Sequence, residues 1–84
     1  MKISGNIVWR EIDGEIFIID SINERIHELN ETASLIFRLI NKNKKIPEIV
    51  DIILDKYEID RKTCENDLKY LLSEFIKRGI ISEN

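Results

Sequence analysis

The sequence predicts an α+β domain built from a three-stranded antiparallel β-meander followed by three α-helices. Residues 7–29 contain short runs rich in isoleucine, valine and phenylalanine that are separated by turn residues, a pattern typical of strands. From residue 31 onward, apolar residues recur about every three or four positions, as they do on one face of a helix. No repeat or low-complexity tract interrupts this order, so residues 1–84 are expected to form a single domain.

The strands are short, and we expect them at Ile7–Ile12, Glu15–Asp20 and Arg25–Leu29. Asp13 and Gly14 link the first two strands. Such a link is a strong hairpin signal because both central positions of a type I′ turn need a positive φ. The next link contains Asn23, a residue type that accepts the left-handed conformation that a tight turn needs. We therefore expect the third strand to pair with the second.

The helices are expected at Glu31–Asn41, Ile46–Tyr57 and Arg61–Arg78. Asn30 and Asp60 are suited to the N-cap position, where a side-chain oxygen accepts a hydrogen bond from a free backbone N–H of the first turn. Pro47 fits the first turn of the second helix, because the N–H that proline lacks has no helical partner there. Gly79 is a suitable stop after the third helix.

Composition and charge exclude several classes of function. The chain has a net charge of −3, no visible secretion signal and no apolar run long enough to span a membrane, so a cytoplasmic location is expected. The single cysteine, Cys64, and the single histidine, His27, are too few for a disulfide or a zinc site. Cys64 lies on an apolar helix stripe, which favours a core residue over a reactive thiol. Because no catalytic constellation is visible, we expect a protein that is not an enzyme and has no metal or cofactor.

The predicted sheet has apolar side chains on both of its faces. Pairing across the first hairpin puts Trp9 opposite Ile18 on one face and Val8 opposite Ile19 on the other. In a two-layer domain, one sheet face packs on the helices and the other meets water. The second apolar face is therefore expected to be covered either by another part of the chain or by a partner.

The third strand and the third helix offer a second surface for a partner. Arg25–Leu29 is expected at an edge of the sheet, where unpaired N–H and C=O groups can capture an extended peptide. On the third helix, one line beside the apolar stripe is formed by Asp67, Tyr70, Glu74 and Arg78. This line is either a solvated face or one wall of a groove whose other wall is the edge strand.

Two stretches of the chain are similar to a known family. IDGEIFIIDSINERIHELNETASLIFRLINKNKKIPEIVDIILDKYEID, followed by DLKYLLSEFIKRGII, resembles the PqqD-like family, also described as the RiPP recognition element. The most telling parts are Asp20 and the run Leu29–Ala33, and the resemblance extends from about residue 8 to residue 81. The chain has Asn23 where many relatives have glycine, and Ile26 and His27 where relatives often have aromatic residues.

The resemblance implies a winged helix-turn-helix-like fold that binds the leader segment of a ribosomally made precursor peptide. The leader would add as a strand to the third strand and lie against the third helix, while a partner enzyme acts on the peptide. That enzyme is often a radical SAM protein, a cyclodehydratase or a leader peptidase. The residues expected to bind the peptide are Arg25, Ile26, His27, Glu28, Leu29, Asp67, Leu68, Tyr70, Leu71 and Glu74. Among them, Ile26, Leu68 and Leu71 are expected to floor apolar pockets, and the favoured interpretation is a standalone leader-binding adaptor.

Two other interpretations stay open. A winged-helix DNA-binding protein needs clustered lysine and arginine, whereas the third helix has a net charge of about +2 and residues 1–29 carry three basic and six acidic residues. A structural subunit or homodimer formed through the mixed sheet face is the other alternative. Neither nucleic acid nor a membrane is an expected partner of the favoured adaptor.

Overall fold

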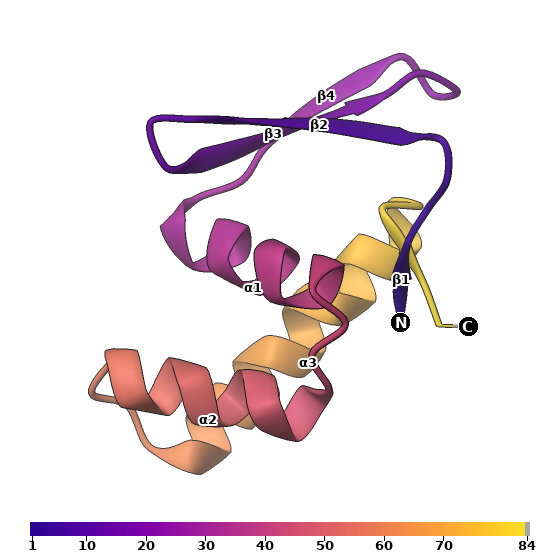
Figure 1. The fold of residues 1–84 in the computed structure, drawn as a ribbon. Coiled ribbons are helices and arrows are strands. Elements are labelled where there is room, and N and C mark those ends of the chain that lie inside the picture. The colour runs from indigo at the N-terminus through magenta and orange to yellow at the C-terminus, as the bar shows by residue number, and fades with distance from the viewer. Residues whose placement is uncertain (84) are drawn as a thin grey trace.

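A three-stranded antiparallel sheet lies over three helices, and a short two-stranded ribbon joins the two ends of the chain (Figure 1). The structure is a computed structural model that describes residues 1–83. Its elements are β1 (Lys2–Ile3), β2 (Ile7–Ile12), β3 (Glu15–Asp20), β4 (Arg25–Glu28), α1 (Glu31–Asn41), α2 (Ile46–Lys56), α3 (Arg61–Lys77) and β5 (Ile81–Ser82). The meander order β2-β3-β4 and the three helices that follow it confirm the predicted α+β fold.

The hairpin of β2 and β3 has the register that its turn residues predict. Asp13 has a φ of 52° and Gly14 a φ of 82°, as a type I′ turn requires. The Cα partners are Val8 with Ile19, Trp9 with Ile18, Arg10 with Phe17 and Glu11 with Ile16, as expected. Ile18 is fully buried against the helices, whereas Ile19 is 40% exposed. The sheet therefore has an inner face toward the helices and an outer face on the opposite side.

The link between β3 and β4 is organised by the carboxylate of Asp20, which is 1% exposed. It accepts hydrogen bonds from the backbone N–H of Asn23, from Nδ2 of Asn23 at 2.8 Å and from Nδ2 of Asn6 at 3.3 Å. These bonds, that of the Asn23 side chain first, hold the pKa of Asp20 below its ordinary value. The left-handed residue here is Glu24, with a φ of 54°, so the prediction that Asn23 takes this conformation is wrong. Asn23 serves instead as a hydrogen-bond donor to the carboxylate.

β4 is joined to α1 by a hydrogen-bond network around Ser34, which is fully buried. Its Oγ accepts from the backbone N–H of Ile16 at 3.0 Å and donates to the carbonyl of Leu29 at 3.2 Å. The N–H of Leu29 donates to the carbonyl of Ile16 at 2.9 Å. Asn30 caps α1 as predicted, accepting from the N–H of Ala33 at 2.8 Å. The end of β4 is therefore fixed both to β3 and to the first turn of α1.

The hydrophobic core lies between the inner face of the sheet and the helices, around Phe37 of α1. The ring of Phe37 makes edge-to-face contacts with Trp9 of β2 and Phe75 of α3, at 5.3 and 6.5 Å between ring centroids. Asp60 caps α3, and Gly79, with a φ of 73°, follows its end, both as predicted. These contacts hold α3 in a fixed position relative to the sheet.

The ends of the elements differ slightly from the prediction. β4, α2 and α3 each end one residue early, at Glu28, Lys56 and Lys77. The pairing of β1 with β5, which sets Lys2 opposite Ser82, was not predicted. Strands of two residues are too short to leave an alternating pattern of apolar and polar residues in the sequence.

Candidate functional site

β4 is an edge strand, and its free edge carries unpaired backbone groups. The sheet order is β2-β3-β4, and no strand within residues 1–83 pairs with the far side of β4. The N–H of Leu29 donates to β3. Because residues of an antiparallel ladder alternate between its two sides, the N–H and C=O groups of Ile26 and Glu28 point to the free edge. The N–H and C=O groups of His27, which lies between them, pair with β3.

A groove of about 450 Å³ separates this edge from α3. Its walls include seven of the residues that the sequence predicted for peptide binding, namely Ile26, His27, Glu28, Leu29, Tyr70, Leu71 and Glu74. Arg78, which the sequence set on the same helix line as Tyr70 and Glu74, also lines it. Phe75 and Ile80 line it too, and sequence analysis did not assign these two to the site. Since Phe75 and Ile80 are buried, they give the groove an apolar floor.

A second, smaller pocket of about 290 Å³ continues the groove along α3. It shares Tyr70 and Leu71 with the groove and adds two further predicted residues, Asp67 and Leu68. The rest of its wall comes from Asn30, Thr32, Ala33, Ile36, Ile53, Ile59 and Cys64. Tyr70 lines both cavities and is 70% exposed, so it is at once a solvated side chain and a groove wall.

The side chains of β4 alternate between the two faces of the sheet. Arg25, His27 and Leu29 are on the inner face; Arg25 lies opposite Asp20 and lines neither the groove nor the second pocket. Ile26 lies opposite Ile19 on the outer face and is 73% exposed. Ile26 therefore forms the outer margin of the groove, which differs from the expectation that it floors a pocket.

Polar groups along the groove are positioned to contact a bound chain. Nε2 of His27 is buried and has no hydrogen-bond partner among the described residues. On α3, Nη2 of Arg78 lies 3.6 Å from Oε1 of Glu74, and the side chains of this pair are 51% and 29% exposed. A pair this exposed exchanges partners at little cost. The groove therefore combines an apolar floor with a donor and acceptors at its rim.

Cys64 is a core residue, as predicted. It is 2% exposed, and burial raises the pKa of its thiol above the ordinary value, which disfavours the reactive thiolate. Within residues 1–83, no three His, Cys, Asp or Glu side chains gather as metal ligands. Over the same residues, no helix combines the length and the apolar character needed to cross a membrane.

Comparison with known proteins assigns the chain to a family. The profile of the PqqD family, described as coenzyme PQQ synthesis protein D, matches residues 15–81. The chain therefore belongs to the PqqD family, which confirms the resemblance that its sequence indicated. Comparison with curated proteins gives no match.

Two solved structures are similar to the chain over nearly their whole length. One, described as "TbiB1 in Complex with the TbiA(beta) Leader Peptide", has a TM-score of 0.95 and 31% identity, and the alignment covers 100% of this chain and 98% of that chain. Another, described as "Lasso peptide synthetase B1 complexed with the leader peptide", has a TM-score of 0.88 and covers 94% and 93% of the two chains. Its identity is 20%, so this second likeness shows the fold alone.

Proposed function

We propose that the chain is a standalone RiPP recognition element, a single domain of residues 1–84 that binds the leader segment of a ribosomal precursor peptide. The observation that carries this proposal is the free edge of β4 facing a groove along α3. It is supported by the similarity to TbiB1, whose structure is described as a complex with a leader peptide. The domain acts as a peptide chaperone in natural product biosynthesis.

The backbone of β4 aligns the leader. The free N–H and C=O groups of Ile26 and Glu28 pair with an extended guest strand. Every peptide has the same backbone, so these bonds set the position of the leader without selecting its sequence. Each bond contributes a net stabilisation of about 1 kcal/mol, so the pairing alone gives modest affinity.

The edge is ordered before the leader arrives. The Oγ of Ser34 bridges β3 and β4, and Asn30 caps the helix that begins directly after β4. A strand that is already fixed loses little conformational entropy when a guest docks, so more of the pairing energy appears as affinity.

Side chains along α3 select the leader sequence. Guest side chains that point to the inner face contact Leu71 and the apolar floor of the groove, while Nε2 of His27 offers a hydrogen-bonding position to a polar guest group. A guest that continues past the Leu29 end of β4 reaches the second pocket, where Leu68 is buried and Asp67 is exposed. We therefore expect a leader with apolar side chains for both cavities.

The bound leader is presented to a separate maturation enzyme, such as a radical SAM protein, a cyclodehydratase or a leader peptidase. In this proposal the enzyme supplies the chemistry, and the chain contributes binding and position. Neither the family match nor the similarity to TbiB1 supports the alternative of a winged-helix DNA-binding protein. The modest net charge of α3 favours a peptide over a phosphate backbone.

A fluorescence anisotropy titration with a labelled candidate precursor peptide, chosen from short open reading frames near the gene for this chain, tests the proposal. Glu28→Pro removes a free-edge N–H, and we expect it to weaken binding at least about tenfold. The matched control Glu28→Ala keeps this N–H and should bind within about threefold of the parent. Thermal melting of both variants verifies that they fold. Equal affinity of Glu28→Pro and the parent would contradict strand addition at β4.

A further inference from the structure

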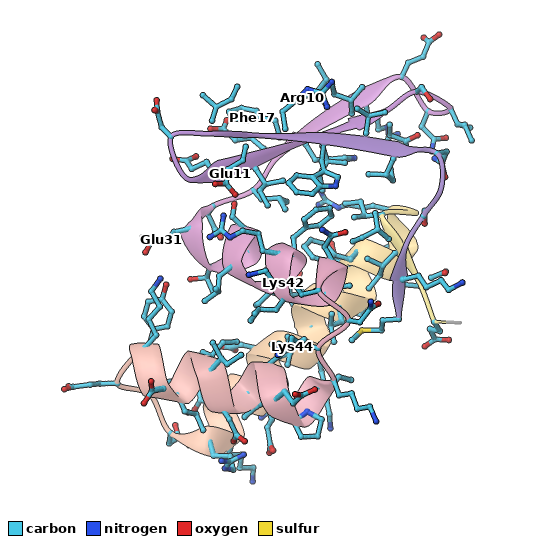
Figure 2. All side chains as sticks on the ribbon, in the orientation of Figure 1. Arg10, Glu11, Phe17, Glu31, Lys42 and Lys44 are labelled. Carbon is cyan, nitrogen blue, oxygen red and sulfur yellow. The ribbon has the colours of Figure 1, made fainter. Side chains whose placement is uncertain are left out.

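The outer face of the sheet carries an apolar patch that nothing within residues 1–83 covers. We call it the outer patch, and it consists of Val8, Ile12, Phe17, Ile19 and Ile26. Four of its members are at least 40% exposed, and Ile26 is the most exposed, at 73%. Figure 2 shows Phe17 and the neighbouring Arg10 on the side of the sheet away from the helices, and Glu11 on the helix side. An apolar surface of this kind on a small domain marks a contact site.

The outer patch and the groove share β4. Ile26 lies at the free edge, and successive residues of a strand point to opposite faces. A leader paired with β4 therefore sends alternate side chains into the groove and the others onto the outer face, directly beside Ile26. Leader binding adds a fourth strand to the outer face. The enlarged surface exists only while the leader is bound.

We propose that the outer patch, enlarged by the leader strand, docks the enzyme that acts on the precursor, through an apolar enzyme surface with a basic rim. This inference rests on the proposed function and adds the place where the second partner binds. A domain that offers a different surface with and without the leader recruits the enzyme preferentially to loaded chains. Leader side chains on the outer face then take part in enzyme recognition, while those in the groove take part in binding to this domain.

The charge of the outer face favours an enzyme with a basic rim over a second copy of the chain or an anionic membrane. On the outer face, Glu15 and Glu28 accompany the single cation Arg10. Asp13 and Glu24, in the turns at opposite ends of the sheet, add further negative charge. A second copy of the chain would bring two such acidic surfaces together, and an anionic membrane would be repelled. Lysine and arginine around an apolar centre are the matching chemistry.

The decisive variant is Ile19→Ser, which removes an apolar side chain from the middle of the patch, opposite Ile26, and leaves every residue of β4 unchanged. Its matched control is Ile46→Ser at the start of α2, where the side chain is 44% exposed and lies far from the sheet (Figure 1). Isothermal titration measures binding of a candidate maturation enzyme, chosen from the genes near that of this chain, with and without the precursor peptide that the chain binds. We expect Ile19→Ser to weaken enzyme binding about tenfold and Ile46→Ser to leave it within about twofold. The precursor should strengthen enzyme binding to the parent.

Separate readouts distinguish the possible failures. The anisotropy titration should give the same leader affinity for Ile19→Ser and the parent. If the parent itself does not bind the leader, the proposed function is overturned. If the parent binds the leader but does not bind the enzyme, only the docking inference is overturned. The same holds if Ile19→Ser binds the enzyme as tightly as the parent does. A concentration-dependent dimer, detected by light scattering, that Ile19→Ser disrupts would also overturn only the docking inference. If Ile19→Ser has a clearly lower melting temperature than the parent, Ile19→Thr, which keeps the β-branched shape, is used as the variant instead.

A charge variant gives an independent arm. Glu15→Lys reverses one charge at the edge of the outer patch, and Asp55→Lys on α2 is its control. We expect Glu15→Lys alone to weaken enzyme binding and to reduce its dependence on salt concentration. If the two variants change enzyme binding equally, the enzyme surface does not have the proposed basic rim.

Discussion

β2 and β4 are the two edge strands of one sheet, yet they are built differently. β2 is the longer, with six residues against four, and so presents more unpaired backbone. The groove and the second pocket nevertheless both lie on the side of β4, next to α3. β4 also ends in the buried hydrogen-bond network of Ser34. β2 contacts α1 through the rings of Trp9 and Phe37, and its polar link to α1 is the half-exposed pair of Arg38 and Glu11. An open edge is therefore suited to bind a peptide when a second wall and a fixed end accompany it.

Proline substitutions on the two edge strands should give the largest difference in leader affinity. The pair next to the type I′ turn, Ile12 with Glu15, is hydrogen-bonded, so the N–H of Glu11 points to the free edge of β2. Glu11→Pro is therefore the counterpart of Glu28→Pro on the other edge. We expect leader affinity to fall at least about tenfold with Glu28→Pro and to stay within about twofold with Glu11→Pro. Similar losses in both variants would mean that the two edges are not distinct.

Ser34→Ala should have the next largest effect, on stability. It leaves the N–H of Ile16 and the C=O of Leu29 without their partner in a fully buried place. The free energy of unfolding in urea should fall by about 2 kcal/mol, because each unsatisfied buried group costs about 1 to 3 kcal/mol. Ser73→Ala, at an exposed serine of α3, should change it by less than about 0.5 kcal/mol. If the two variants are equally stable, the network of Ser34 does not hold β4.

The carboxylate of Asp20 makes the β3–β4 link sensitive to acid. Its pKa lies below the ordinary value of 3.8, so the folded state favours the ionised form. This contribution is fully present above the unfolded pKa and is lost as pH falls through the lower folded pKa. Asp20→Asn should therefore be destabilised at pH 7, and its gap from the parent should narrow below about pH 4. Urea unfolding across this range, with Asp55→Asn as a control, measures the gap. A gap that widens in acid would show that the ionised carboxylate of Asp20 does not stabilise the link.

The pair of Arg38 and Glu11 should give the smallest effect. Nη1 of Arg38 lies 2.9 Å from Oε1 of Glu11, but the side chains are 30% and 44% exposed. A double-mutant cycle of Arg38→Gln and Glu11→Gln should give a coupling below about 1 kcal/mol that salt reduces further. A coupling as large as the cost of Ser34→Ala would show that β2 is held as firmly as β4.

The local features of the fold were predictable from the sequence. Asp13 and Gly14 fixed the hairpin register, and Asn30 and Asp60 marked two helix starts, because each acts on neighbours a few residues away. The Ser34 network was not predictable, because it joins residues 18 positions apart and depends on how α1 packs under the sheet. A serine within a helix carries no sequence signal for such a role.

The candidate site was predictable in part. The residues of β4 and the line along α3 follow from strand and helix periodicity, which places them on one edge and one face. The second pocket forms where the three helices meet, and helical periodicity within one segment does not show that a pocket opens beside Ile36 and Ile53. The outward direction of Ile26 depends on strand register, which the tie between Leu29 and Ile16 sets.

Residue-resolved amide exchange of β4 shows whether a leader adds as a strand to the free edge of the sheet. In the free chain the N–H groups of Ile26 and Glu28 face solvent, while that of His27 is already bonded to β3. With excess precursor peptide, exchange at Ile26 and Glu28 should slow at least about tenfold, and exchange at His27 should change little. If exchange at Ile26 and Glu28 is unchanged while the precursor binds, the leader does not add to this edge.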